Sequence, residues 1–194
     1  MSDKILVLLS GGMDSVYCAQ KALTDGRLAA CLFIDWGHPA KKQEKKAAQD
    51  WCDVYGVPMV CRSIDLDTAP MDEDCSQASR YVPSRNLAFI SLAANVAKSI
   101  GAGVIWYGAT YDDRHDYPDC TAAWVSRVNL VLAVEGLRLE APAIKMTKTQ
   151  IAQIVNDPEN TFSCYQPANG QHCDNCKSCQ ARKNALDLRW EENQ

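Results

Sequence analysis

The stretch that decides the fold is VLLSGGMDSVYCAQ, residues 7–20. An apolar run comes first, Gly11 and Gly12 make a turn, and a helical stretch follows Asp14. Glycines let a backbone adopt positive φ and come close to a ligand. The helix behind them presents free N–H groups and the positive end of its dipole. With the hydroxyls of Ser10 and Ser15, this loop is predicted to hold an anion, and phosphate is the obvious one.

Outward from this stretch, strands alternate with helices. The continuous apolar run at 4–9 is expected of a strand covered on both faces, and further strands are predicted at 29–35, 58–64 and 103–109. Helices are predicted at 13–25, 41–56, 84–101 and 121–138. This alternation implies parallel pairing and an α/β fold with a doubly wound parallel sheet. Ligands of such sheets bind beyond the carboxyl ends of the strands, so the loops after Leu9, Asp35, Ile64 and Gly108 are expected to form the site.

The remaining segments carry weaker patterns. Residues 65–82 are polar and acidic and are expected to form a loop or lid, and 140–144 a short strand or extended piece. Thr147 and Gln150 match a capping box that opens a helix at 148–156. A final short helix is predicted at 181–190.

Composition sets broad limits on the function. At 194 residues the chain is expected to be one α/β domain, 1–158, with a small appended segment, 159–194, packed on it. A net charge of −4 gives no support for a nucleic-acid-binding surface. We find neither a run of about 18 apolar residues nor a signal peptide, so no membrane contact and a cytoplasmic location are expected.

Ten cysteines divide into two groups. The scattered ones are expected to be small buried hydrophobes: Cys18, Cys31, Cys52, Cys61, Cys75 and Cys120. The other four have the spacing C-x8-C-x2-C-x2-C: Cys164, Cys173, Cys176 and Cys179. Four soft ligands suit a tetrahedral, structural Zn²⁺ site, and an iron–sulfur cluster is the alternative. His172 is a weaker candidate ligand than the cysteines.

The opening loop is neither of two common phosphate loops, because it has no Walker A lysine and no G-x-G-x-x-G. It resembles the SGGxDS pyrophosphate loop of the ATP pyrophosphatases. That resemblance implies an adenine nucleotide alpha hydrolase-like (PP-loop) fold. It also implies ATP binding by Leu9, Ser10, Gly11, Gly12, Met13, Asp14 and Ser15. Because carboxylates repel phosphate, Asp14 is expected to help hold the Mg²⁺ that accompanies ATP.

Further segments resemble one family in its own order. They are VPSRN at 82–86, YPDC at 117–120, Pro142 followed by Lys148, and Ser163-Cys164-Tyr165 with the four-cysteine pattern. From about residue 4 to 183 the chain resembles the 7-cyano-7-deazaguanine synthases, the QueC family. The resemblance implies that ATP adenylates the carboxylate of 7-carboxy-7-deazaguanine and that ammonia gives an amide. A second activation dehydrates the amide to the nitrile, a step in queuosine and related deazapurine biosynthesis.

The resemblance also implies roles for residues. Asp14, Arg85 and Lys148 are the expected catalytic residues, the last two as cations between two anions, with Arg114 as a further candidate cation. Substrate binding is expected from Arg85, Asn86, Tyr117 and Asp119, the last accepting hydrogen bonds from a guanine-like base. Trp36 is expected to stack on adenine. Family members commonly form homodimers, and the apolar helix at 85–100 is compatible with that.

Two departures from the family pattern leave alternatives open. The family's YGQRH is replaced by DWGHP at 35–39, which loses a basic residue, and the charged residues after YPDC are replaced by TAAW at 121–124. The enzyme could therefore stop at the amide or use another 7-substituted deazaguanine. Two other classes are a tRNA-modifying PP-loop enzyme, disfavoured by the acidic charge balance, and a non-catalytic nucleotide-binding module containing zinc.

Overall fold

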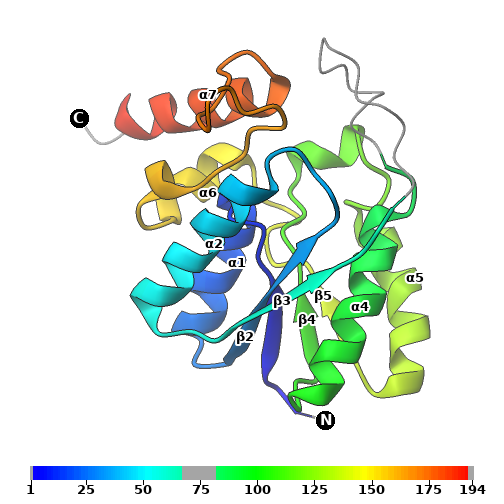
Figure 1. Ribbon diagram of the computed structural model, residues 1–194. Coiled ribbons are helices and arrows are strands. Elements are labelled where there is room, and N and C mark those ends of the chain that lie inside the picture. Colours follow the sequence, from blue (N-terminus) through cyan, green and yellow to red (C-terminus); the bar gives the residue numbers. More distant parts are fainter. Residues whose placement is uncertain (1, 67–81, 192–194) are drawn as a thin grey trace.

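The fold is a five-stranded parallel sheet with helices on both faces, as expected. The computed structural model describes residues 2–66 and 82–191 (Figure 1). The strand order is β3-β2-β1-β4-β5, and all four neighbouring pairs are parallel. The strands are β1 (Ile5–Leu8), β2 (Leu28–Asp35), β3 (Met59–Ser63), β4 (Val104–Trp106) and β5 (Arg138–Glu140). The order reverses at β1, so the loop that follows β1 lies at the switch point where such sheets bind ligands.

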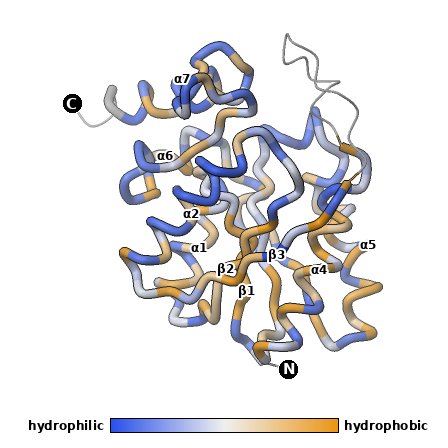
Figure 2. The backbone as a smooth tube through the Cα atoms, viewed as in Figure 1, coloured by the Kyte–Doolittle hydropathy of each residue, from blue (hydrophilic) through white to orange (hydrophobic). Residues whose placement is uncertain are grey.

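Alternate residues of the strands point to opposite faces of the sheet and pack into two separate hydrophobic cores. One face of β1 gives Ile5 and Val7 to a core with α1 (Met13–Thr24), α2 (Lys41–Tyr55) and α6 (Lys148–Ile154). The other face gives Leu6 to a core with α4 (Arg85–Ser99) and α5 (Ala122–Leu132). Burial of both faces of β1 explains the continuous apolar run at its position in the sequence, whereas the edge strand β3 is largely exposed. Figure 2 shows the apolar residues gathered on the strands, α4 and α5, while α2 and α7 are mainly hydrophilic.

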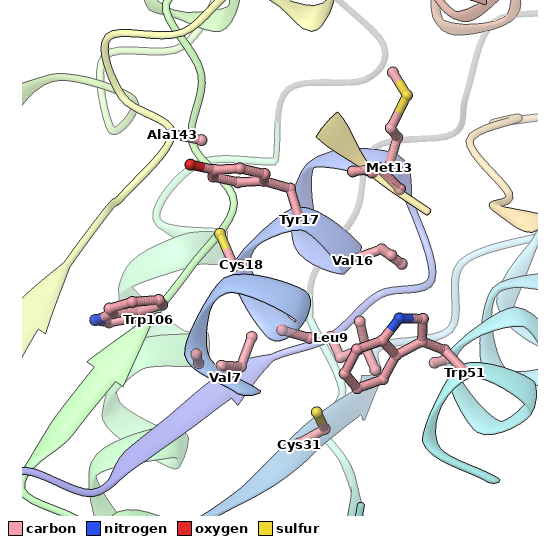
Figure 3. Close-up of a cluster of buried hydrophobic side chains, with 14 of the residues drawn as sticks. Val7, Leu9, Met13, Val16, Tyr17, Cys18, Cys31, Trp51, Trp106 and Ala143 are labelled. Atoms are coloured by element: carbon pink, nitrogen blue, oxygen red, sulfur yellow. The ribbon is translucent and has the colours of Figure 1, made fainter. Parts of the chain in front are cut away.

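The α1 core fixes the start of the phosphate loop. Val16 and Cys18 of α1 belong to one cluster with Val7 of β1 and Trp106 of β4, with Cys18 on the Trp106 side and Val16 on the opposite side (Figure 3). This packing holds β1 and α1 on either side of residues 9–12. The turn between them is therefore tied to both the sheet and its covering helix.

The C-terminal segment packs on the sheet domain rather than apart from it. Its helix α7 (Lys177–Glu191) lies against α6, and Ala185 belongs to the α1 core. The Phe162 N–H donates to Gly11 O at 2.8 Å. The cysteine-rich segment is thus joined to the phosphate loop directly. Across the described ranges we find no helix long and apolar enough to cross a membrane.

Several predicted boundaries are wrong. The last strand lies at Arg138–Glu140 rather than 140–144, because α5 ends at Leu132 and a short 3-10 helix, Ala133–Glu135, leads into Gly136 at φ 68°. That left-handed turn starts the strand earlier than the sequence indicated. Helix α7 begins at Lys177, four residues before the prediction. Most of the predicted loop at 65–82, and Cys75, lie outside the described residues.

Candidate active site

A cavity of about 260 Å³ opens at the carboxyl ends of β1, β2 and β4. The predicted loops after Leu9, Asp35 and Gly108 all reach it, because carboxyl ends of parallel strands meet at one edge of the sheet. Predicted site residues on its wall are Leu9, Ser10, Gly12, Met13, Asp14, Ser15, Trp36, Arg85, Asn86, Tyr117 and Lys148. The structure thus brings together residues that lie up to 139 positions apart, from Leu9 to Lys148.

The phosphate loop is held by its own hydroxyls. Ser15 Oγ donates to Gly12 O at 2.8 Å, and the Ser10 N–H donates to Ser15 Oγ at 3.2 Å. Gly12 is the N-cap of α1 and offers no side chain to the first turn. The start of the helix therefore faces the cavity without a capping side chain, as an anion site requires.

Gly11 supports the loop from behind rather than lining the cavity. Its φ is +86°, and a Cβ there would lie 2.4 Å from the backbone oxygen of Glu44 in α2. A side chain at this position would force α2 and the loop apart. The predicted positive φ is found at Gly11, but the close approach is to protein backbone, and approach to a ligand stays a prediction.

Lys148 is paired with two carboxylates at the edge of the cavity. Its Nζ lies 2.7 Å from Asp14 Oδ2 and 3.2 Å from Asp113 Oδ1. Thr110 Oγ1 holds Asp113 through a 2.6 Å hydrogen bond. Asp112 Oδ2 accepts the Lys148 backbone N–H at 2.8 Å, which fixes the start of α6.

Burial and charge act in opposite directions in this cluster. Burial raises the pKa of Asp14, and attraction to Lys148 offsets only part of that effect. Burial works to lower the pKa of Lys148, but Asp14 and Asp113 outweigh it and the pKa is raised. Asp14 Oδ1 is buried without a hydrogen-bond partner among the described residues. An oxygen in that condition is suited to a divalent cation, so Asp14 and Asp113 fit the Mg²⁺ of a nucleotide complex.

Arg85 has no carboxylate partner among the described residues. Its guanidinium lies over the Trp36 ring, 5.2 Å from the centroid, and no salt bridge joins it to a described acidic residue. Its Nε is buried without a partner in the described chain. Ser84, at φ 60°, turns the chain into α4 and sets Arg85 at the first position of that helix. An aromatic-backed guanidinium in a cavity is suited to a carboxylate or phosphate.

His38 and Glu44 line the cavity and were not predicted. His38 is 2% exposed, stacks on Trp36 at 4.9 Å, and accepts the Ala40 N–H on Nδ1 at 3.2 Å. Burial, with Arg85 nearby, lowers the pKa of His38 to about 4, so the ring is neutral. Glu44 Oε2 lies 3.8 Å from His38 Nδ1.

A sequence signal could have found Glu44. Its neighbours in KKQEKK suggest a solvated helix face. However, Ala40 and Ala48, four residues to either side, are both fully buried. Positions spaced by four share one face of a helix, so Glu44 stands on the buried stripe of α2.

Besides Gly11, two predicted residues are not on the cavity wall. Asp119 is buried, its backbone oxygen accepts from Tyr107 Oη at 2.8 Å, and its neighbour Cys120 lines the cavity instead. The Arg114 guanidinium lies 3.2 Å from the centre of the Tyr111 ring and does not reach the wall.

The four predicted cysteines converge. All four Sγ atoms lie within 4.8 Å of one another, and those of Cys173 and Cys179 are 3.9 Å apart. Four thiolates about 2.3 Å from one Zn²⁺ ion would be about 3.8 Å apart, so the group fits such an ion. Burial opposes the charge on Cys173, but the N–H groups of Asn175 and Cys176 lower its pKa to about 7. His172 is not part of this group, because its Nε2 accepts the Ser163 N–H at 3.3 Å.

Comparison with known proteins identifies the family of this chain. The family model described as "Queuosine biosynthesis protein QueC" matches residues 4–189. A 7-cyano-7-deazaguanine synthase from Marinobacter nauticus is 31% identical, over 96% of this chain and 93% of that protein. Two solved structures share the fold at low identity. They are the U34-tRNA thiolase NcsA from Methanococcus maripaludis with its [4Fe-4S] cluster (TM-score 0.56, 15% identity, 98% of this chain and 66% of that one) and NMN synthetase from Francisella tularensis (0.55, 12%, 100% and 87%). With nearly its whole length matched by that family model, the chain belongs to the QueC family.

Proposed function

We propose that this protein is an ATP-dependent carbon–nitrogen ligase that converts 7-carboxy-7-deazaguanine and ammonia to 7-cyano-7-deazaguanine. The observation that carries the proposal is one cavity in a QueC-family chain that combines the phosphate loop, Arg85 and the Lys148 cluster. A carboxylate is a poor electrophile because oxide is a poor leaving group. Transfer of AMP to it supplies a good leaving group.

The first step joins two anions. A substrate carboxylate oxygen forms a bond to the α-phosphorus of ATP, and the bond to the bridging oxygen breaks and releases pyrophosphate. Residues 10–15 hold the phosphates that leave. Arg85 binds the substrate carboxylate, and Lys148 stabilises the negative charge that develops on the phosphate. Preorganised cations lower the barrier to a reaction between two anions. Asn86, Tyr117 and Trp36 provide the walls for the two planar bases.

Two metals accompany this function. Mg²⁺ would enter with ATP, held by Asp14 and Asp113, and would neutralise phosphate charge. Zn²⁺ would be held by Cys164, Cys173, Cys176 and Cys179 as a structural ion. Each thiolate of a four-iron cluster binds a different iron, so such cysteines must stand further apart than these do.

A second candidate product is the 7-amide. Trp124 belongs to the segment that replaces the family's charged residues after YPDC. Its ring centroid lies 5.8 Å from that of Tyr107, a cavity residue. Loss of charge near the base-binding wall affects the second activation or the choice of 7-substituent. The first adenylation is common to both products.

The decisive assay incubates the protein with ATP, ammonium and 7-carboxy-7-deazaguanine and identifies products by mass spectrometry. We expect the nitrile, with the amide as an intermediate. Ser10→Ala should reduce turnover, and the same change at the exposed Ser99, far from the loop in sequence, should not. Accumulation of amide alone would support the second candidate, and absence of both products would reject the ligase.

We also propose that the protein forms a homodimer in a reducing compartment such as the cytoplasm. Leu130, Val131 and Val134 expose 76%, 71% and 84% of their surface at the end of α5, which is unusual for three neighbouring apolar residues. The described cysteines are all free thiols, as a reducing compartment requires. Light scattering of the wild type and of Val134→Glu tests the dimer.

A further inference from the structure

Glu44 is the one carboxylate on the cavity wall that has no cation or hydrogen-bond donor in direct contact among the described residues. His38 Nδ1 lies 3.8 Å from its Oε2. That nitrogen already accepts the Ala40 N–H, so it has no proton to give to Glu44. Asp14 and Asp113, in contrast, share Lys148. A largely buried carboxylate without a partner is costly, which suggests a role with a ligand.

The position of Glu44 is fixed rather than adaptable. Its helix is anchored on both sides by the fully buried Ala40 and Ala48, and its backbone oxygen abuts Gly11 of the phosphate loop. The side chain is 18% exposed, and that exposure is to the cavity that Glu44 lines. The carboxylate is therefore held beside the site where the acyl-adenylate would form.

The chemistry of the proposed function needs a proton acceptor there. At neutral pH the nitrogen source is almost entirely ammonium, which has no lone pair for attack. Asp14 is committed to Lys148, and the neutral His38 uses its basic nitrogen for Ala40. Glu44 is left as the base that could bind a small cation and take its proton.

We propose that Glu44 binds ammonium and accepts its proton, which delivers ammonia to the adenylated carbonyl carbon. This inference rests on the proposed ligase function. An ammonium N–H bond breaks and its proton goes to a Glu44 oxygen. The ammonia nitrogen then bonds to the carbonyl carbon, the C–O bond to AMP breaks, and AMP leaves with that electron pair and one nitrogen proton. Glu44 returns its proton to water after the products leave.

The electrostatics suit an acceptor that works near neutrality. Burial raises the pKa of Glu44 to about 7, with Arg85 opposing that rise. Among the described residues, the titratable groups that face Glu44 are the neutral His38 and Arg85, and the phosphate loop meets its backbone at Gly11, which does not titrate. A base with a pKa near the working pH is the most effective proton acceptor.

The test separates the two half-reactions. Exchange of pyrophosphate into ATP, with the acid substrate and without ammonium, reports adenylation. Amide formation at varied ammonium and pH reports the nitrogen step. In Glu44→Gln we expect unchanged exchange and amide formation slower by about 100-fold at neutral pH, the scale of general base catalysis. The wild-type inflection near pH 7 should vanish, and the variant's rate should follow free ammonia into alkaline pH.

Two further variants control the result. Asp50→Asn removes a carboxylate from the exposed face of the same helix and should match the wild type. Glu44→Asp keeps an acceptor and should retain both part of the rate and the inflection. Glu44→Gln with the wild-type pH profile would overturn the inference, as would loss of exchange together with amide formation, which would mean that Glu44 only shapes the phosphate loop. Absence of exchange in the wild type would reject the ligase function itself, and this inference with it.

Discussion

At the scale of single residues, Gly11 carries the sharpest steric constraint. Gly11→Ala should lose stability twice, through left-handed strain of about 1–2 kcal/mol and through the collision of Cβ with Glu44 O at 2.4 Å. Gly26 is a matched control, because its φ is +66° but nothing lies within 4 Å of its missing Cβ. Urea unfolding should give a clearly larger loss for Gly11→Ala than for Gly26→Ala. Equal losses would show that α2 yields without cost.

Glu44 should also make the free energy of unfolding depend on pH, an effect that can be measured without an activity assay. Burial raises its folded-state pKa from 4.5 to about 7, so the folded protein binds that proton more tightly than the unfolded chain. The resulting stabilisation is present below pH 4.5 and is lost as pH rises through about 7. A shift of this size amounts to about 3 kcal/mol at most.

Unfolding curves of the wild type and Glu44→Gln across this pH range measure the difference. The wild type should lose stability relative to the variant as pH rises, because only the wild type must ionise a buried carboxylate. Asp50→Asn should run parallel to the wild type. A constant difference between wild type and Glu44→Gln would mean that Glu44 is solvated in the folded protein.

At the scale of elements, the capping box of α6 links stability to the site. The Gln150 N–H donates to Thr147 Oγ1 at 3.3 Å and the Thr147 N–H to Gln150 Oε1 at 3.0 Å, as the sequence predicted. Thr147→Ala should cost about 1 kcal/mol and weaken ATP binding, because α6 begins with Lys148. Thr121→Ala removes the equivalent cap of α5, which receives the Trp124 N–H. It should cost similar stability without changing ATP affinity by calorimetry; equal effects on ATP would contradict this link.

The helices and strands also show which features of the fold can be predicted from local sequence patterns. The parallel sheet, the loop at 10–15 and the α6 cap followed from local signals: apolar runs, glycines and a four-residue cap. The start of β5 did not, because it depends on pairing of Arg138 with Val104 across the sheet. Site prediction failed in the same way, since Asp113 joins the Lys148 cluster only through the fold, while Asp119 turns its backbone oxygen to Tyr107.

At the scale of the whole molecule, the four-cysteine group and the phosphate loop are directly connected. The chain from Phe162 to Tyr165 runs from the bond to Gly11 O into the cysteine group, and Ser163 and Tyr165 line the cavity. Helix α7, which begins right after Cys176, packs against α6 and contributes Ser178 and Arg182 to the cavity wall. Removing the metal should therefore destabilise the wall of the active-site cavity as well as the four-cysteine group.

Chelation should lower the melting temperature and the affinity for ATP together, because the energy of a structural metal site is folding energy. Cys176→Ser should reproduce both losses, whereas Cys61→Ser, at an exposed free thiol on β3, should reproduce neither. Elemental analysis of the wild type should find one zinc per chain, since four thiolates this close enclose a single ion. Iron in place of zinc, or a chelated protein that melts like the wild type, would contradict the structural role that the spacing of these four sulfurs implies.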